Sequence, residues 1–253
     1  MAEIPSGSRA VAAGAIRCGV CGTESRPPPF RPAPPEQPPD LDLRPGEPVR
    51  STMARWLQQC PSCGYAAPNI TKAHPAAAQA VAAAPFRALL AESGYPPLGR
   101  RFLAWAHVLE ETGALHAAAE ATLQAAWVAD DLGRDDLARM WRLDAVALWR
   151  GGPPLDSEQT VRIIDALRRA EAWDDAAATA EALGLADPPE AVAQVVSLEL
   201  RLIAARDAGR HTVATALPPP ARRPHVSHQA APPRTAARGE GFVAKLRRWL
   251  GRG

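Results

Sequence analysis

The sequence predicts a mainly α-helical protein with a small N-terminal ribbon, an irregular α-solenoid or helical bundle, and a disordered tail. Three observations lead to this fold class. All four cysteines lie in two Cys-x-x-Cys pairs in the first quarter of the chain. Between residues 70 and 209 the apolar residues recur with the 3.6-residue period of a helix. Beyond residue 209 the chain is rich in Pro, Ala and Arg, a composition that buries too little apolar surface to fold.

The two cysteine pairs predict one structural zinc site. A Cys-x-x-Cys turn directs two thiolates at one ion roughly 2.3 Å away, and two such turns complete the tetrahedral set that structural zinc prefers. A glycine follows each pair, at Gly22 and Gly64, as expected where the backbone takes a positive φ and turns its amides toward the sulfurs. The four predicted zinc ligands are Cys18, Cys21, Cys60 and Cys63.

Other uses of these cysteines fit the sequence less well. Disulfides are typical of exported proteins, and residues 1–16 lack the basic start and apolar core of a secretory signal. A redox pair is expected between a strand and a helix, whereas both pairs lie among Pro, Gly and Arg. The separation between the pairs exceeds the usual ribbon spacing of about 15–20 residues. We therefore expect an insertion within the ribbon.

The N-terminal part divides into a disordered stretch, residues 1–16, and the zinc ribbon, residues 17–69. The insertion in the ribbon is the segment 26–48, which contains ten prolines. Such a density of proline excludes a helix and favours polyproline II or an irregular loop. A ligand for SH3-type domains is the alternative interpretation of this segment. From Val49 to Gln59 the apolar residues predict a strand that leads into the second cysteine pair.

Residues 70–209 are predicted to form the helical domain. Pro85 interrupts its first helix. Asp156 with Gln159 makes a capping box, and Asp187 is placed as the N-cap of a last helix that ends at Gly209. The positions predicted to face inward are, helix by helix, Phe102, Trp105, Ala106 and Leu109; Leu115, Ala119, Thr122 and Ala126; Leu137, Met140, Trp141, Ala145 and Leu148; Thr160, Ile163, Ile164 and Leu167; and Val192, Val195, Val196, Leu202 and Ile203.

One charged residue, Asp144, falls on the apolar side of its predicted helix. A carboxylate in such a position is usually hydrogen-bonded to an arginine or to the end of a neighbouring helix. We therefore expect a structural role for Asp144.

Two segments of the helical domain are related to each other. Residues 109–119 and 167–177 share a leucine, a large apolar residue six positions later and an alanine four positions after that. This pattern resembles the turn of a tetratricopeptide-like helical hairpin, in which small alanines allow close helix crossing. The offset is 58 residues rather than 34 or a multiple of it, so the pattern favours an irregular arrangement over a regular array.

A family resemblance rests on three runs of sequence, Leu41–Pro45, Met53–Ala67 and Ala125–Asp131. They resemble an uncharacterised bacterial family in which a zinc ribbon precedes a tetratricopeptide-like helical domain. The resemblance covers about residues 17–150. It implies metal binding through the four cysteines and partner binding by the helical region, and it implies no catalytic activity. The insertion and the tail beyond Gly209 lie outside it.

The tail is predicted to have two parts, a disordered linker at residues 210–241 and an amphipathic basic helix at residues 242–252. Residues 209–253 carry nine basic side chains and one acidic side chain, whereas residues 70–208 carry 13 and 20. So short a helix needs a surface to form, such as an anionic membrane, a partner groove or the acidic helical body. Its apolar face comprises Phe242, Val243, Leu246, Trp249 and Leu250.

The function that these features favour is that of a non-enzymatic adaptor or scaffold. The sequence has no Gly-rich phosphate loop, nucleophile elbow or His-Glu-x-x-His motif, and a four-cysteine zinc site leaves no open position for substrate. We expect a cytoplasmic protein with peripheral membrane contact through the tail, because no apolar run approaches the roughly 20 residues of a membrane span.

The alternative is a zinc ribbon that binds nucleic acid. It is motivated by the basic tail and by four arginines near the cysteine pairs, Arg17, Arg44, Arg50 and Arg55. The acidic helical domain counts against it, because that domain would repel phosphate.

Overall fold

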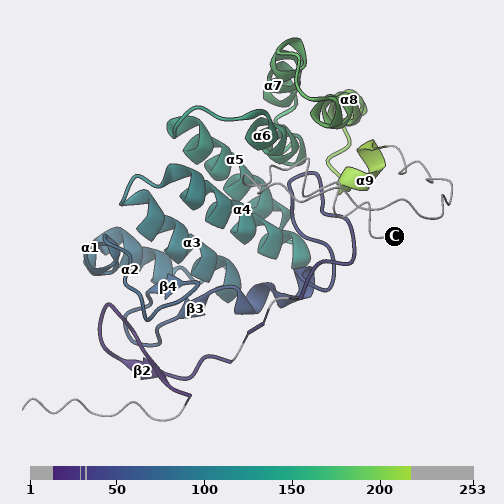
Figure 1. Ribbon diagram of the computed structural model, residues 1–253. Helices are drawn as coiled ribbons and strands as arrows, with labels where there is room; N and C mark the ends of the chain where they lie inside the picture. Colours follow the sequence, from purple (N-terminus) through teal and green to yellow (C-terminus); the bar gives the residue numbers. More distant parts are fainter. Residues whose placement is uncertain (1–13, 29, 32, 218–253) are drawn as a thin grey trace, which may run out of the picture. The chain divides into compact units, whose positions relative to one another are not determined.

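The computed structural model describes residues 14–28, 30–31 and 33–217 (Figure 1). It divides the chain into two compact units. The first unit comprises Met1–Pro34 and Pro48–Pro154, and the second comprises Pro35–Glu47 and Leu155–Gly253. The described part is mainly helical with small two-stranded sheets near the N-terminus, so the predicted fold class is confirmed at this level.

The ribbon of the first unit consists of two short antiparallel hairpins. Strand β1 (Ile16–Arg17) pairs with β2 (Glu24–Ser25), and β3 (Gln58–Gln59) pairs with β4 (Ala66–Ala67). In each hairpin the first strand ends just before a cysteine pair and the second begins three residues after it. Each pair of strands therefore flanks one of the two cysteine turns.

The strand predicted from Val49 to Gln59 is wrong over most of its length. Residues Arg50–Arg55 form a 3₁₀-helix, η1, and only Gln58 and Gln59 are extended in a strand. The hydroxyl of Thr52 bonds the carbonyl of Val49 and accepts a hydrogen bond from the indole of Trp56. These local bonds stabilise a helical turn. The strand was predicted from the apolar residues alone, and their pattern is also compatible with such a turn.

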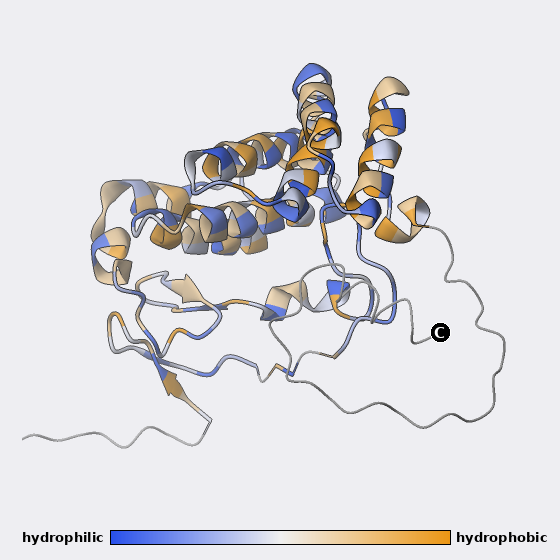
Figure 2. Ribbon diagram, turned by 45° about the horizontal axis from the view of Figure 1, so that its top comes forward, coloured by the Kyte–Doolittle hydropathy of each residue, from blue (hydrophilic) through white to orange (hydrophobic). Residues whose placement is uncertain are grey.

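Five α-helices complete the first unit. They are α1 (Ala77–Ala82), α2 (Ala84–Ala91), α3 (Pro97–Glu110), α4 (Leu115–Asp131) and α5 (Asp135–Gly151). Pro85 lies in the first turn of α2, where a missing N–H costs nothing, so it separates α1 from α2 as expected. Helix α4 packs against both α3 and α5 (Figure 1). Figure 2 shows hydrophobic and hydrophilic residues intermixed along each of these helices.

The ribbon and the first helices share one hydrophobic core. Its buried members include Cys18 and Cys60 from the ribbon, Phe86 from α2, and Ala104 and Val108 from α3. The metal-binding turns therefore pack on the helices that follow them. This arrangement differs from the predicted boundary at residue 70, which placed the ribbon and the helices in separate domains.

The buried face of α5 is rotated from the predicted one. Leu137, Trp141 and Ala145 are buried as expected, but Met140 is 37% exposed and Trp149 is only 1% exposed. Pairing of Arg142 with Asp130 of α4, through two hydrogen bonds of 2.9 and 2.5 Å, fixes this rotation. Burial of a paired arginine is a feature that apolar periodicity does not detect.

In its described residues, up to Leu217, the second unit contains four helices. They are α6 (Ser157–Arg169), α7 (Trp173–Leu185), α8 (Glu190–Ala204) and α9 (Val213–Ala216). The capping box of Asp156 and Gln159 is confirmed. The predicted N-cap at Asp187 is wrong, because Pro189 precedes the first helical residue, and α8 ends at Ala204 rather than at Gly209.

Part of the proline-rich insertion belongs to the second unit. Within Pro35–Glu47, Leu41 is 1% exposed, and the backbone amide of Leu41 donates to the carbonyl of His211. The guanidinium of Arg162 on α6 bonds the carbonyl of Asp42. The insertion was predicted as a stiff loop of the ribbon. Its second half instead packs in another unit, held by side chains more than 100 residues later in sequence.

The first residues of the predicted linker, 210–217, are also folded. Asp40 and Thr212 form an isolated β-bridge, and Val213 in α9 is buried. The predicted disordered linker 210–241 is therefore wrong for its first eight residues. Its remainder, the amphipathic helix at 242–252 and residues 1–13 of the predicted disordered stretch 1–16 lie outside the described residues. The end of that stretch is ordered instead, because Ile16 pairs in strand β1.

Three helix–helix turns share one geometry. In the turns after α3 and α6, the amide of Ala114 bonds the carbonyl of Leu109, and the amide of Ala172 bonds that of Leu167. In the turn after α4, the amide of Arg134 likewise donates to the carbonyl of Ala129. Each is a Schellman-type end with one residue at positive φ. The related segments found in the sequence thus adopt the same helical turn.

Candidate metal centre

The two cysteine pairs occupy turns of identical design. In the first turn the amide of Cys18 donates to the carbonyl of Thr23, and in the second the amide of Cys60 donates to that of Tyr65. The glycine after each pair returns its amide to the carbonyl of the first cysteine, at 2.9 and 3.1 Å. Gly22 and Gly64 both have φ of +75°, as the sequence predicted.

Two other contacts bring the turns together across the insertion. The amide of Gly19 donates to the carbonyl of Ile70, just after the second hairpin. A Cβ at Gly19 would come within 2.8 Å of the backbone of Thr71 and Ala73, so only glycine fits this approach. A Cβ at Gly64 would overlap the side chain of Leu90 on α2. These contacts were not predicted, because they depend on the packing of distant segments.

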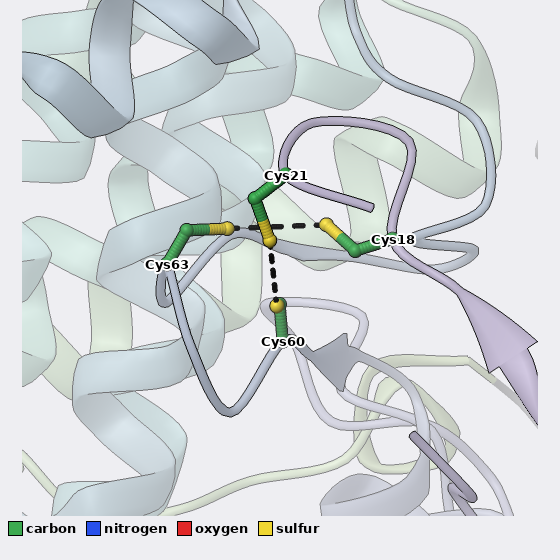
Figure 3. Close-up of side chains that lie close together, drawn as sticks. All are labelled: Cys18, Cys21, Cys60 and Cys63. Carbon is green, nitrogen blue, oxygen red and sulfur yellow. Dashed lines mark hydrogen bonds between the residues drawn. The ribbon is translucent and has the colours of Figure 1, made fainter. Parts of the chain in front are cut away.

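The four sulfur atoms converge (Figure 3). All four lie within 4.8 Å of one another. The sulfurs of Cys18 and Cys63 are 3.8 Å apart, and those of Cys21 and Cys60 are 3.5 Å apart. Both close contacts therefore join one turn to the other, as they must if the two turns share one ion. The predicted ligand set is brought together in full.

The donor set fits a tetrahedral metal ion. Four thiolates at about 2.3 Å from a central zinc ion would lie about 3.8 Å from each other. The two closest separations, 3.5 and 3.8 Å, are near this value. None of the four cysteines forms a disulfide in the structure. The arrangement is thus a four-cysteine site of the size that a structural metal ion needs.

The thiols of the site differ in their surroundings. Burial raises the pKa of Cys18 and of Cys63, although backbone amides nearby act in the opposite direction. The thiol of the exposed Cys21 donates to the Thr23 hydroxyl at 3.3 Å, and its hydrogen bonding with the Thr23 side chain and then with the Thr23 backbone lowers the pKa of Cys21 to about 6. A divalent cation among the sulfurs would favour the thiolate form of all four. Metal binding at this site therefore releases protons.

The arginines of the nucleic-acid alternative are dispersed in the structure. Arg17 forms an ion pair with Glu24 at 2.9 Å, and Arg44 is 2% exposed within the second unit. Arg50 is half-buried, and Arg55 is exposed. The burial of Arg44 and the pairing of Arg17 reduce the basic surface that these arginines offer to phosphate.

A second feature of the first unit was not predicted as a site. A groove with a volume of about 580 Å³ lies between α3 and α5, above α4. Asp144 lies in this groove and forms no hydrogen bond or ion pair with a described side chain, so the expected structural role for it is wrong. Asp144 is exposed at the edge of that apolar side, next to the buried Trp141 and Ala145, and borders the groove.

Comparisons of the chain with protein-family models, with curated proteins and with solved structures give no match. The family resemblance therefore stays a prediction. Among the described residues, no helix is both long enough and apolar enough to cross a lipid bilayer.

Proposed function

We propose that this protein is a non-enzymatic adaptor that binds a basic, amphipathic helix of a protein partner. Zinc held by the four cysteines would stabilise the ribbon, and the groove of α3, α4 and α5 would receive the helix. The observation that carries the proposal is the groove, which combines apolar side chains with two carboxylates, Glu110 and Asp144, that have no ion pair or side-chain hydrogen bond within the described part of the chain. A tetratricopeptide-like hairpin, the arrangement that the sequence predicted, would present its helices for the same purpose.

The zinc centre would serve structure rather than chemistry. Four protein thiolates fill the tetrahedral coordination of zinc and leave no position for water or substrate. Two of the four cysteines are buried in the core shared with α2 and α3. The metal would therefore fix the turns against those helices and stabilise the wall from which the groove is built.

The groove is lined by both apolar and polar side chains, which come from different helices. The α3 wall contributes Leu103 and Glu110, the floor includes Thr122 of α4, and the α5 wall contributes Asp144 and Leu148. None of the described residues that line it is a lysine or arginine. Leu103 and Leu148 are half-buried, so a ligand would cover apolar surface that the unit itself leaves partly exposed.

The two carboxylates of the groove, Glu110 and Asp144, favour binding of a positively charged group. Partial burial in the groove, and then the negative charge of Glu110, raises the pKa of Asp144. Neither Glu110 nor Asp144 has an ion pair or side-chain hydrogen bond among the described residues. An arginine or lysine between the two carboxylates would replace their mutual repulsion with attraction.

The shape of the α5 wall favours a helical ligand. Met140, Asp144, Ala147 and Gly151 recur at intervals of three or four residues and so share one face of α5. Met140 lies one turn beyond Asp144 and is 37% exposed, which extends the apolar surface past the groove. A helix that places leucine-type side chains at i, i+3, i+4 and i+7 matches such a surface.

The test uses a defined peptide and the full chain. The probe is a fluorescent 14-residue helix with leucines on one face and lysines and arginines on the other; its matched control carries glutamates in place of the cations. We expect the basic probe to bind and the acidic probe not to bind. The combined change Glu110→Gln and Asp144→Asn should weaken binding about tenfold, since each exposed charge pair contributes roughly 0.2–1 kcal/mol.

A matched variant and a nucleic-acid arm complete this experiment. Asp174→Asn with Glu181→Gln removes the same charge from exposed positions of α7 and should leave probe affinity unchanged. Equal affinity of the wild type and the groove variant would contradict the proposal. Tighter binding of single-stranded RNA or DNA than of the probe, unaffected by the groove variant, would support the nucleic-acid alternative instead.

A further inference from the structure

We infer that the groove of α3, α4 and α5 is occupied in the free protein by the chain's own C-terminal segment, Phe242–Leu250. The inference rests on the proposed function of the groove and adds its regulation. The tail would act as a tethered competitor, and a partner helix would have to displace it.

The segment has the chemistry that the groove requires. Phe242, Leu246, Trp249 and Leu250 supply large apolar side chains with the spacing of one helix face. Lys245, Arg247 and Arg248 lie between them, and the tail from residue 209 onward carries nine basic side chains and one acidic one. The described residues that line the groove supply Glu110 and Asp144 and no basic side chain except His107.

The length of the tail segment as a helix also matches the length of the groove. The nine residues Phe242–Leu250 would span about 14 Å as a helix, at roughly 1.5 Å per residue. The α5 wall of the groove extends over the eleven residues from Trp141 to Gly151, which is about 16–17 Å by the same measure. The segment is too short to hold a helix alone in water, so the groove would supply the surface on which it folds.

Because the tail segment is covalently linked to the rest of the chain, weak binding is enough for it to occupy the groove. Twenty-four residues separate Leu217, the last described residue, from Phe242. The expected r.m.s. span of an unstructured chain of that length is roughly 25–30 Å. For a groove within that span, a segment held in this way competes with an effective concentration on the order of 1 mM. Even an intrinsic dissociation constant of about 100 μM would leave the groove roughly 90% occupied.

The experiment compares probe binding to full-length variants. Leu246→Asp with Trp249→Asp disables the tail segment, and Ala236→Asp with Ala237→Asp introduces the same charge into the preceding linker. We expect the basic probe helix to bind the tail-disabled chain about tenfold more tightly than the wild type. The linker control should match the wild type, and adding Glu110→Gln and Asp144→Asn to the tail-disabled chain should remove most of the gain.

A second readout follows the segment directly. In the wild type, hydrogen exchange of the Phe242–Leu250 amides should be slowed, and the groove changes Glu110→Gln and Asp144→Asn should restore fast exchange. The charge-matched changes Asp174→Asn and Glu181→Gln should leave exchange slow. Protection that survives the groove changes would overturn the inference.

The remaining outcomes separate this inference from the proposed function. Equal probe affinity for wild type and tail-disabled chain overturns the inference and leaves the proposed function standing. Failure of every variant to bind the probe overturns the proposed function and the inference with it. If the tail changes abolish only co-sedimentation with phosphatidylserine vesicles and leave the probe affinity unaltered, the segment is a membrane anchor and the inference is wrong.

Discussion

Glu171 occupies a backbone position that glycine takes in the related turns. Its φ is +61°, compared with +71° for Gly113 and +64° for Gly133 at the corresponding places after α3 and α4. Left-handed conformation costs a residue with a Cβ roughly 1 kcal/mol or more relative to its preferred regions, whereas glycine adopts it freely. Glu171 therefore carries strain that its counterparts avoid.

We expect Glu171→Gly to stabilise the second unit by up to about 1 kcal/mol. Chemical unfolding of the full chain, followed through exchange of the α6 and α7 amides, would measure the change. Glu171→Ala is the control, since it removes the same side chain and keeps the Cβ. If alanine stabilises as much as glycine, the gain comes from losing the carboxylate and not from relief of φ.

The pairing of α6 with α8 depends on a buried ionic cluster. Arg168 of α6 donates to Asp165 at 2.5 Å and to Glu199 of α8 at 2.7 Å, and all three side chains are at most 2% exposed. One nitrogen of the same guanidinium also bonds the carbonyls of Asp207 and Gly209. Two carboxylates thus share a single cation, and one oxygen of each has no hydrogen-bond partner among the described residues. Two negative charges beside one positive charge favour retention of one proton by the Asp165 and Glu199 carboxylates.

The cluster predicts a pH dependence of α8. Burial, and then the charge of Asp165, raises the pKa of Glu199, while Arg168 acts in the opposite direction. The folded unit therefore holds a proton that the unfolded chain has lost above about pH 4.3. This stabilising contribution is fully present below that pH and is lost as the pH rises through the folded pKa of Glu199.

We expect the free energy of opening of α8 to fall as the pH rises from 5 to 8, and we expect Glu199→Gln to abolish most of that fall. Hydrogen exchange of the α8 amides, corrected for the intrinsic exchange rate at each pH, provides the measurement. Glu190→Gln, at an exposed position of the same helix, should retain the slope of the wild type. A slope in the Glu199→Gln variant equal to that of the wild type would show that the proton lies elsewhere.

At the scale of the whole molecule, the shared core links the metal centre to some helices and not to others. Cys18 and Cys60 lie in one cluster with Phe86 of α2 and Val108 of α3. The helices of the second unit belong to a different compact unit. Loss of the metal should therefore act unevenly along the chain.

We expect purified protein to carry about one zinc per chain and Cys60→Ser to lose it. Removal of zinc, by chelation or by this substitution, should speed amide exchange in the ribbon, α1 and α2, at a cost of several kcal/mol, and should leave α6 and α8 protected. Ser62→Ala, in the same turn, is the control. Metal content near zero in protein prepared without chelator, or equal loss of protection in both units, would contradict this prediction.

The sequence by itself determined what local chemistry controls. The paired spacing of four cysteines and the glycine after each pair specified both metal-binding turns, because each turn is set by six consecutive residues. Most helices also followed from the sequence, since prolines and glycines interrupt the chain at their ends. The capping box at Asp156 is one such local signal, and its partner lies only three residues away.

Only the tertiary structure decided which segments meet. The requirement for Gly19 arises from Thr71 and Ala73, and the burial of Leu41 arises from residues near His211; no local pattern contains these partners. The groove was missed for the same reason. Asp144 on an apolar helix face was visible in the sequence, but a face that binds a ligand and a face that packs in the core have the same period. Packing of α3 and α5 against α4 buried Trp141 and Ala145 but left Asp144 exposed beside them, and this depends on contacts between distant residues.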